Sequence, residues 1–123
     1  MSIRPTEIKL HKQSRTLEIT FEDGATFQLP AEYLRVYSPS AEVQGHGPGQ
    51  GVLQVGKEDV AIENIQPVGN YGIQLFFDDN HNTGIYAWDT LYDLGRNYEK
   101  YWNQYLERLK EAGYERRDPS EII

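Results

Sequence analysis

Cysteine is absent from the chain, and long apolar runs are missing as well. The lack of cysteine excludes disulfide bonds, thiolate zinc sites, cysteine-ligated iron–sulfur clusters and a cysteine nucleophile. No stretch approaches the roughly 20 apolar residues of a membrane-spanning helix. The opening MSIRPTEIKL also lacks the apolar core of a secretory signal. We therefore expect a cytoplasmic protein that is not inserted in a membrane.

Positive charge is scarce too. The chain has 12 Lys and Arg against 19 Asp and Glu, which gives a net charge of -7. A nucleic-acid-binding protein normally presents a basic face, because phosphate contacts supply much of its affinity. We therefore predict no nucleic-acid partner. A chain of 123 residues has the size of one domain and can bury a core without disulfides or metals.

The first third of the chain predicts three antiparallel strands joined by tight turns. Apolar and polar residues alternate in TEIKLHK, TLEITF and TFQLP, which is typical of half-buried strands. Pairing Ile19 with both Ile8 and Phe27 places the apolar side chains of all three strands on one face. The second turn is then a three-residue loop, Glu22–Gly24, in which Gly24 takes the left-handed conformation.

A second group of strands is predicted after residue 60. Apolar residues alternate again from Ile73 onward, and a turn of polar residues follows Phe77. Pairing Leu75 with Ile85 predicts a further hairpin, with His81 at its tip. Pro67 cannot donate a hydrogen bond to a neighbouring strand, so it indicates an edge strand or a bend.

Between the two groups, residues 30–35 predict a short helical turn. The stretch SPSAEVQGHGPGQG, residues 38–51, is rich in glycine and proline and predicts a loop. It is long for so small a domain. Long loops in compact domains are often functional, although a plain surface connection is the alternative.

The last third predicts helices. Asp89 is a candidate cap of a short first helix. Beyond Gly95, apolar and aromatic residues recur at helical spacing, at Tyr98, Tyr101, Trp102, Tyr105, Leu106 and Leu109. The intervening charged residues fall on the opposite face. Gly113 predicts the end of the helix, and residues 114–123 are expected to form a loose tail.

Sequence motifs for catalysis are lacking. There is no Gly-x-Ser-x-Gly elbow, and the glycine-rich run at residues 45–51 is neither a P-loop nor a dinucleotide fingerprint. No histidine belongs to the His-x-Asp/Glu motif of non-haem iron oxygenases. Asp78, Asp79 and His81 leave only a weak candidate metal site at a hairpin tip. We predict no catalytic residues.

Two segments resemble a known family. LRVYSPSAEVQGHGPGQ (Leu34–Gln50) and FFDDNHNTGIYAWDTLYDLG (Phe76–Gly95) are similar to the gamma-butyrobetaine hydroxylase-like N-terminal domain, also called domain of unknown function 971. The resemblance spans about Ile8 to Gly95. In carnitine-synthesis hydroxylases such a domain precedes the catalytic domain, so the resemblance implies an accessory role and not the oxygenase reaction. Similar domains are also fused to ATPases of iron–sulfur assembly.

The resemblance also implies where the family holds a structural zinc ion. Carried over by position, three cysteine ligands fall on Ser38, Ser40 and Val43, and a histidine ligand falls on His81. The serine hydroxyl groups are poor zinc ligands, and the valine side chain has no atom that can bind zinc. We therefore expect the fold of the family without its metal.

These observations predict one α+β domain, an antiparallel meander-type sheet packed with a C-terminal amphipathic helix. Residues 1–95 would form the family-like domain, residues 96–113 the helix packed on it, and residues 114–123 a flexible tail. We predict a noncatalytic binding or accessory module without a cofactor. Its partner would be another protein, linked to iron–sulfur or redox metabolism. The predicted contact residues are Arg35, His46, His81, Tyr86 and Trp88.

Two alternatives remain open from the sequence. The chain could serve as a metal-binding protein or an accessory subunit of a 2-oxoglutarate and iron oxygenase. It could instead be an interaction protein that dimerises through its aromatic helix, because Tyr and Trp suit half-wet interfaces.

Overall fold

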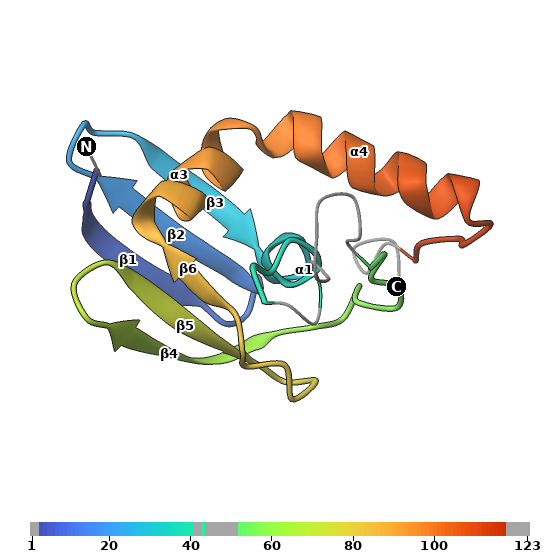
Figure 1. Ribbon diagram of the computed structural model, residues 1–123, viewed down its shortest axis with the longest axis horizontal. Helices are drawn as coiled ribbons and strands as arrows, with labels where there is room; N and C mark the ends of the chain where they lie inside the picture. The colour runs from blue at the N-terminus through green and yellow to red at the C-terminus, as the bar shows by residue number, and fades with distance from the viewer. Residues whose placement is uncertain (1–2, 41–42, 44–51, 118–123) are drawn as a thin grey trace.

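The computed structural model describes residues 3–40, 43 and 52–117. It has the predicted α+β fold (Figure 1). The elements in chain order are β1 (Pro5–His11), β2 (Thr16–Phe21), β3 (Thr26–Pro30), α1 (Ala31–Val36), β4 (Ile62–Val68), β5 (Gly72–Phe77), β6 (Ile85–Ala87), α3 (Trp88–Arg96) and α4 (Tyr98–Glu111). The strands form two three-stranded antiparallel sheets, β1-β2-β3 and β4-β5-β6, rather than one continuous sheet.

The register of the first sheet is the predicted one. Ile19 pairs with Ile8 on one side and with Phe27 on the other. The Phe21 N–H donates to the Ala25 carbonyl at 2.9 Å and so closes the three-residue loop. Gly24 has a φ of +88°, a conformation that side chains disfavour. The alternation of side chains and the glycine in the turn therefore indicate the same register for this sheet.

The register predicted for β6 is wrong by one residue. Ile73 pairs with Tyr86, and Gln74 pairs with Ile85. Tyr86 is fully enclosed and donates its hydroxyl hydrogen bond to the Leu34 carbonyl at 2.6 Å, whereas Ile85 is 43% exposed. The alternation of apolar and polar residues along β5 and β6 is compatible with both the predicted and the observed register. The tyrosine takes the interior position because its ring fills the core and its hydroxyl finds a partner there.

The core lies between the two sheets, α1 and α3. Figure 1 shows the sheets side by side, with α3 close to the strands and α4 extending past α1. The enclosed apolar side chains include Leu17, Ile19, Phe21, Leu29, Tyr33, Leu34, Leu75, Phe77, Tyr86 and Leu91. They come from both sheets and both of these helices, so one core unites the domain.

Strands β1 and β4 each form one edge of a sheet, and among the described residues helix α3 packs on β3 and β6 instead. The pairing of each is interrupted by a bulge or irregularity, between Pro5 and Glu7 in β1 and between Ile62 and Asn64 in β4. Each strand also contains a proline, and Pro67 confirms the predicted edge position.

The aromatic face of α4 packs on α1. The Tyr33 ring centroid lies 4.8 Å from that of Tyr98 and 6.2 Å from that of Trp102. The Tyr37 hydroxyl donates to the Tyr101 carbonyl at 2.6 Å. The aromatic stripe is thus partly covered by its own chain. Tyr98, Tyr101 and Trp102 remain partly exposed, and dimerisation through this helix stays a prediction.

Two details of the C-terminal third differ from prediction. Asp89 is not the cap of α3, which begins one residue earlier, after Ala87. The residues after α4 are not loose throughout: Tyr114–Arg117 lie on the body of the protein through hydrogen bonds to Glu32 and Glu58. The remainder of the predicted tail lies outside the described residues. Over the described ranges, no helix combines the length and apolar character that crossing a bilayer requires.

Candidate functional site

The four positions to which the resemblance assigns zinc ligands lie together at one corner. His81 Nε2 lies 2.9 Å from Ser38 Oγ. The Ser40 N–H donates to Ser38 Oγ at 3.2 Å, and the Val43 N–H donates to the Ser40 carbonyl at 3.0 Å. A Cβ atom on Gly84 would lie 2.3 Å from Ser38 Oγ, so only glycine fits beside this hydroxyl. The corner is therefore a closely packed hydrogen-bonded unit.

The side chains of this corner do not fit a zinc ion. Valine offers no donor atom, and neutral hydroxyls are weak ligands compared with thiolates. Ser40 Oγ is engaged instead with Thr83 Oγ1 at 2.6 Å. Among residues 3–40, 43 and 52–117, no group of three or more His, Cys, Asp or Glu could hold a metal ion. Hydrogen bonds connect the positions to which the resemblance assigns metal ligands.

Beside the corner, Asp79 organises the tip of the β5–β6 hairpin. Its Oδ2 accepts hydrogen bonds from Arg35 Nε at 2.9 Å and Lys57 Nζ at 3.1 Å, and its Oδ1 accepts from the His81 N–H at 3.2 Å. Partial burial would raise the pKa of Asp79, but the hydrogen bonds from Lys57 and Arg35 outweigh it and hold the pKa low. The carboxylate serves the fold as an internal ion-pair partner.

Most of the predicted contact residues are not on the surface. Tyr86 is fully enclosed, His81 is 5% exposed, and Arg35 is buried as well, so their assignment to a partner surface is wrong. Each has its polar atoms directed to partners inside the chain. His46 lies outside the described residues. Trp88 alone of the five is seen with a partly exposed side chain.

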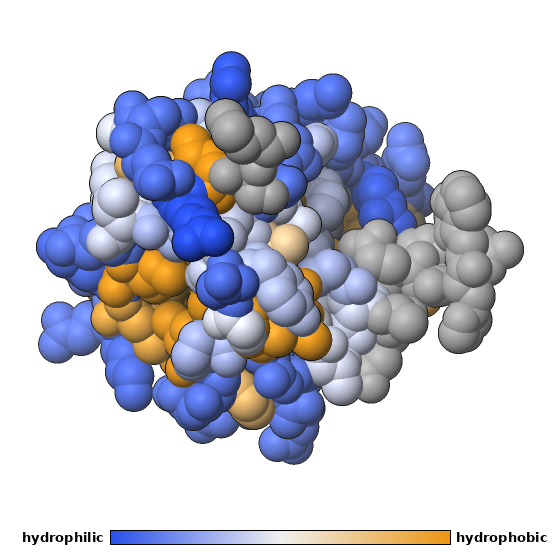
Figure 2. All heavy atoms as spheres, turned by 60° about the vertical axis from the view of Figure 1, so that its left-hand side comes forward, coloured by the Kyte–Doolittle hydropathy of each residue, from blue (hydrophilic) through white to orange (hydrophobic). Residues whose placement is uncertain are grey.

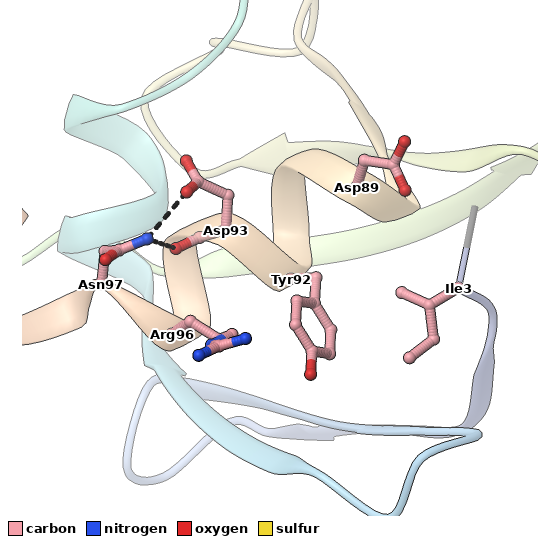
Figure 3. A pocket seen from close by; sticks show the side chains of 6 residues that line it. All are labelled: Ile3, Asp89, Tyr92, Asp93, Arg96 and Asn97. Carbon is pink, nitrogen blue, oxygen red and sulfur yellow. Dashed lines mark hydrogen bonds between the residues drawn. The ribbon is translucent and has the colours of Figure 1, made fainter. Parts of the chain in front are cut away.

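A different surface is hollowed along α3. A groove of about 560 Å³ is lined by Ile3, Asp89, Tyr92, Asp93, Arg96 and Asn97 (Figure 3). Figure 3 shows the Tyr92 ring between the side chains of Arg96 and Ile3. The Arg96 guanidinium carbon lies 5.9 Å from the centre of that ring. Cation and ring therefore form one wall of the groove.

Hydrogen bonds hold the polar lining of the groove in place. The Tyr92 hydroxyl donates to Asp23, which raises the pKa of Tyr92 and lowers the pKa of Asp23. Asp93 Oδ1 accepts from Asn97 Nδ2 at 2.8 Å, and Asp93 Oδ2 accepts from the Tyr101 hydroxyl at 2.9 Å. The lining is thus positioned before any partner arrives.

A second hollow adjoins the first. It measures about 180 Å³ and is lined by Arg4, Asn70, Tyr71, Ala87, Trp88 and Asp89. Asp89 belongs to both hollows, and Tyr71 is 54% exposed. We call the combined area the α3 surface, made of Ile3, Arg4, Tyr71, Trp88, Asp89, Tyr92, Asp93 and Arg96. Figure 2 brings forward the side of the molecule that lies at the left of Figure 1, and hydrophobic residues gather there among hydrophilic ones.

Sequence reasoning missed most of this surface, although a signal for it existed. Trp88, Tyr92 and Arg96 are spaced by four residues and so share one helical face, whereas Leu91 and Leu94 of the same helix are buried. An aromatic and basic face opposite an apolar one indicates an exposed contact surface. Tyr71 and Ile3 reach it from other segments, which the sequence pattern does not reveal.

The family comparison covers most of the chain. The description "Gamma-butyrobetaine hydroxylase-like, N-terminal" matches residues 8–92. No curated protein matches the chain. Two similar proteins with NMR solution structures are 45% and 50% identical, with TM-scores of 0.83 and 0.81. The alignments cover 100% and 95% of this chain, and 96% and 87% of the respective neighbours.

A third similar structure carries a family name. It is the crystal structure of a protein of unknown function from Acidithiobacillus ferrooxidans that belongs to the DUF971 family. It is 39% identical, with a TM-score of 0.63, and the alignment covers 75% of this chain and 92% of the neighbour. The family match over most of the chain agrees with the similarity to this DUF971 structure, and the chain belongs to the gamma-butyrobetaine hydroxylase-like N-terminal family.

Proposed function

We propose that this protein is a noncatalytic binding module that recognises another protein through the α3 surface. The observation that carries the proposal is the pair of adjoining hollows along α3, lined by tryptophan, tyrosine and arginine. These three residue types contribute most to binding energy at protein interfaces, because they combine a large apolar area with a polar group. The hydrogen-bonded lining also limits the entropy lost on association.

The enclosed Ser38–His81 pair supports a noncatalytic role. A serine hydroxyl beside a histidine nitrogen suggests a nucleophile and its base. Ser38, however, is completely buried, and its hydroxyl already accepts the Ser40 N–H. A substrate would have no path to this oxygen without opening the core, so the pair is better explained as part of the fold.

The charge of the α3 surface indicates what kind of partner it fits. Arg4 and Arg96 carry positive charge, Asp89 and Asp93 carry negative charge, and the rings of Tyr71 and Trp88 stand among them. A partner segment with an apolar side chain and flanking charges of both signs is complementary to such a surface. We place that partner among cytoplasmic proteins of iron–sulfur or redox metabolism, as the relationship of similar domains to iron–sulfur assembly ATPases suggests.

Affinity capture from the native cell tests the proposal. The variant Tyr71→Ala/Arg96→Ala removes two exposed side chains of the surface, and each change should alter the free energy of unfolding by only about 0.5 kcal/mol or less. We expect it to lose at least about tenfold in captured partner relative to the unmodified protein. The matched control is Lys100→Ala/Glu107→Ala on the exposed face of α4, which should capture normally. Equal capture by both variants, with equal melting temperatures, would refute the α3 surface as the binding site.

A further inference from the structure

The chain reverses direction after α4 and returns to the body of the protein. Gly113 has a φ of +76°, and the Tyr114 N–H donates to the Leu109 carbonyl at 2.9 Å. We call the following residues, Tyr114–Arg117, the C-terminal strap. Arg116 and Arg117 of the strap both make ion pairs with residues far away in the sequence.

Arg116 occupies a site formed by α1 and α4. Its Nε donates to Glu32 Oε2 at 2.8 Å, and its Nη2 donates to Glu32 Oε1. Its guanidinium carbon lies 5.1 Å from the centre of the Trp102 ring. Only arginine combines a two-pronged hydrogen bond to a carboxylate with a flat cation over an aromatic ring. Glu32 is only 6% exposed, so it depends on this cation.

Glu58 receives the rest of the strap. Its two carboxylate oxygens lie 3.1 and 2.9 Å from the Tyr114 hydroxyl, which donates to them, and Oε2 also accepts the Arg117 N–H at 3.0 Å. Burial would raise the pKa of Glu58, but the hydrogen bonds from Arg117 and Tyr114 outweigh it and lower the pKa. The strap thus joins the end of α4 to two acidic side chains from separate segments.

Hydrogen bonds and ion pairs make up most of the contacts that hold the strap. Another segment with the same polar groups can make the same contacts in its place. An open strap would leave Glu32 buried without its arginine, which is costly unless another cation takes the place. We propose that Glu32 and Trp102 form an arginine receptor, beside which Glu58 holds the neighbouring tyrosine and backbone of the bound segment. The C-terminal strap fills this receptor in the resting protein, and an arginine-bearing segment of a partner protein fills it when the strap opens. This receptor lies on the α1–α4 side of the molecule and is independent of the α3 surface.

A peptide-binding experiment on the full chain tests the receptor. The variant Arg116→Ala leaves the receptor without its own arginine. We expect a fluorescent synthetic peptide of residues 110–118 to bind this variant at least about tenfold more tightly than the unmodified protein, in which the strap competes. Fluorescence anisotropy measures both affinities. The same peptide with lysine in place of Arg116 should bind the variant about tenfold more weakly, because lysine cannot make the two-pronged contact.

Three further variants make the result decisive. Glu32→Gln/Arg116→Ala lacks the receptor carboxylate and should not bind the peptide. Arg117→Ala removes only an exposed ion pair with Asp59, which contributes little, and keeps the backbone N–H that binds Glu58, so it should behave nearly like the unmodified protein. Arg116→Lys retains a cation beside Glu32 and replaces Arg116→Ala if circular dichroism shows that the latter is unfolded. Two results would overturn the proposal. The first is peptide binding that changes neither when Arg116 is removed nor when Glu32 is replaced, and the second is no peptide binding to any variant.

Discussion

Tyr86 in β6 and Tyr92 in α3 both donate a hydrogen bond through the phenol, but in opposite settings. Tyr86 is enclosed and donates to the Leu34 carbonyl, whereas Tyr92 lies on the α3 surface and donates to the Asp23 carboxylate. The first bond joins β6 to α1 inside the core. The second holds a ring at the wall of a groove. The same chemical group therefore fixes the fold in one region and orients a ring on the α3 surface, which we propose as the binding site, in the other.

The arginines repeat this contrast. Arg35 is buried and makes its ion pair with Asp79 at the hairpin tip. Arg96 is exposed and lies over the Tyr92 ring at the groove. Substitutions in the interior should therefore change stability, and substitutions on the α3 surface should change binding. Three predictions sharpen this comparison.

The largest effect is expected at alkaline pH. Burial is the main cause that raises the pKa of Tyr33, Tyr86 and Tyr105 above the ordinary value. Above about pH 10 the unfolded chain loses these phenolic protons while the folded protein keeps them, so the free energy of unfolding falls as the pH rises. Urea titrations at neutral pH and at about pH 11 measure the fall. If all tyrosine hydroxyls ionised while the protein stayed folded, the burial of these three tyrosines would be contradicted.

The next effect concerns Tyr86 itself. Tyr86→Ala should lower the free energy of unfolding by about 3–5 kcal/mol, because it leaves a cavity and an unsatisfied carbonyl in the core. Tyr86→Phe keeps the ring and should cost about 1–2 kcal/mol. Chemical denaturation measures both values. An Ala variant as stable as the unmodified protein would place Tyr86 on the surface after all.

The smallest of the three concerns the corner of Ser38 and His81, to which the resemblance assigns zinc ligands. Ser38→Ala should cost about 1–3 kcal/mol, since the Ser40 N–H and His81 lose their partner. A double-mutant cycle with His81→Ala should give a coupling energy of about 0.5–3 kcal/mol, and exposed Asn82→Ala serves as control. Strictly additive single effects would mean that the contact between Ser38 and His81 contributes nothing to stability.

The first sheet could be predicted from the sequence because its information is local. Short turns and alternation fix the partners of Ile19, and Gly24 marks the loop. The register of β6 could not be predicted in this way. Its choice between Tyr86 and Ile85 depends on the Leu34 carbonyl, which the chain brings close only in three dimensions.

The candidate sites show the same division. The resemblance identified the corner of Ser38 and His81, and the structure brings these residues together. It could not indicate that the corner is enclosed. The pairing of Glu32 with Arg116 joins residues that are 84 positions apart, and neither residue belongs to a local motif. Composition favours a loose tail there, and only the folded arrangement shows the contact.

The borders of the two sheets carry a consequence for the behaviour of the protein in solution. Helix α3 packs against β3 and β6, while the remaining borders, β1 and β4, each combine a proline with an interrupted pairing. An uninterrupted strand at a border is a template on which further copies can stack into fibrils. The prolines and interrupted pairing of β1 and β4 therefore disfavour the addition of a further copy along these two strands.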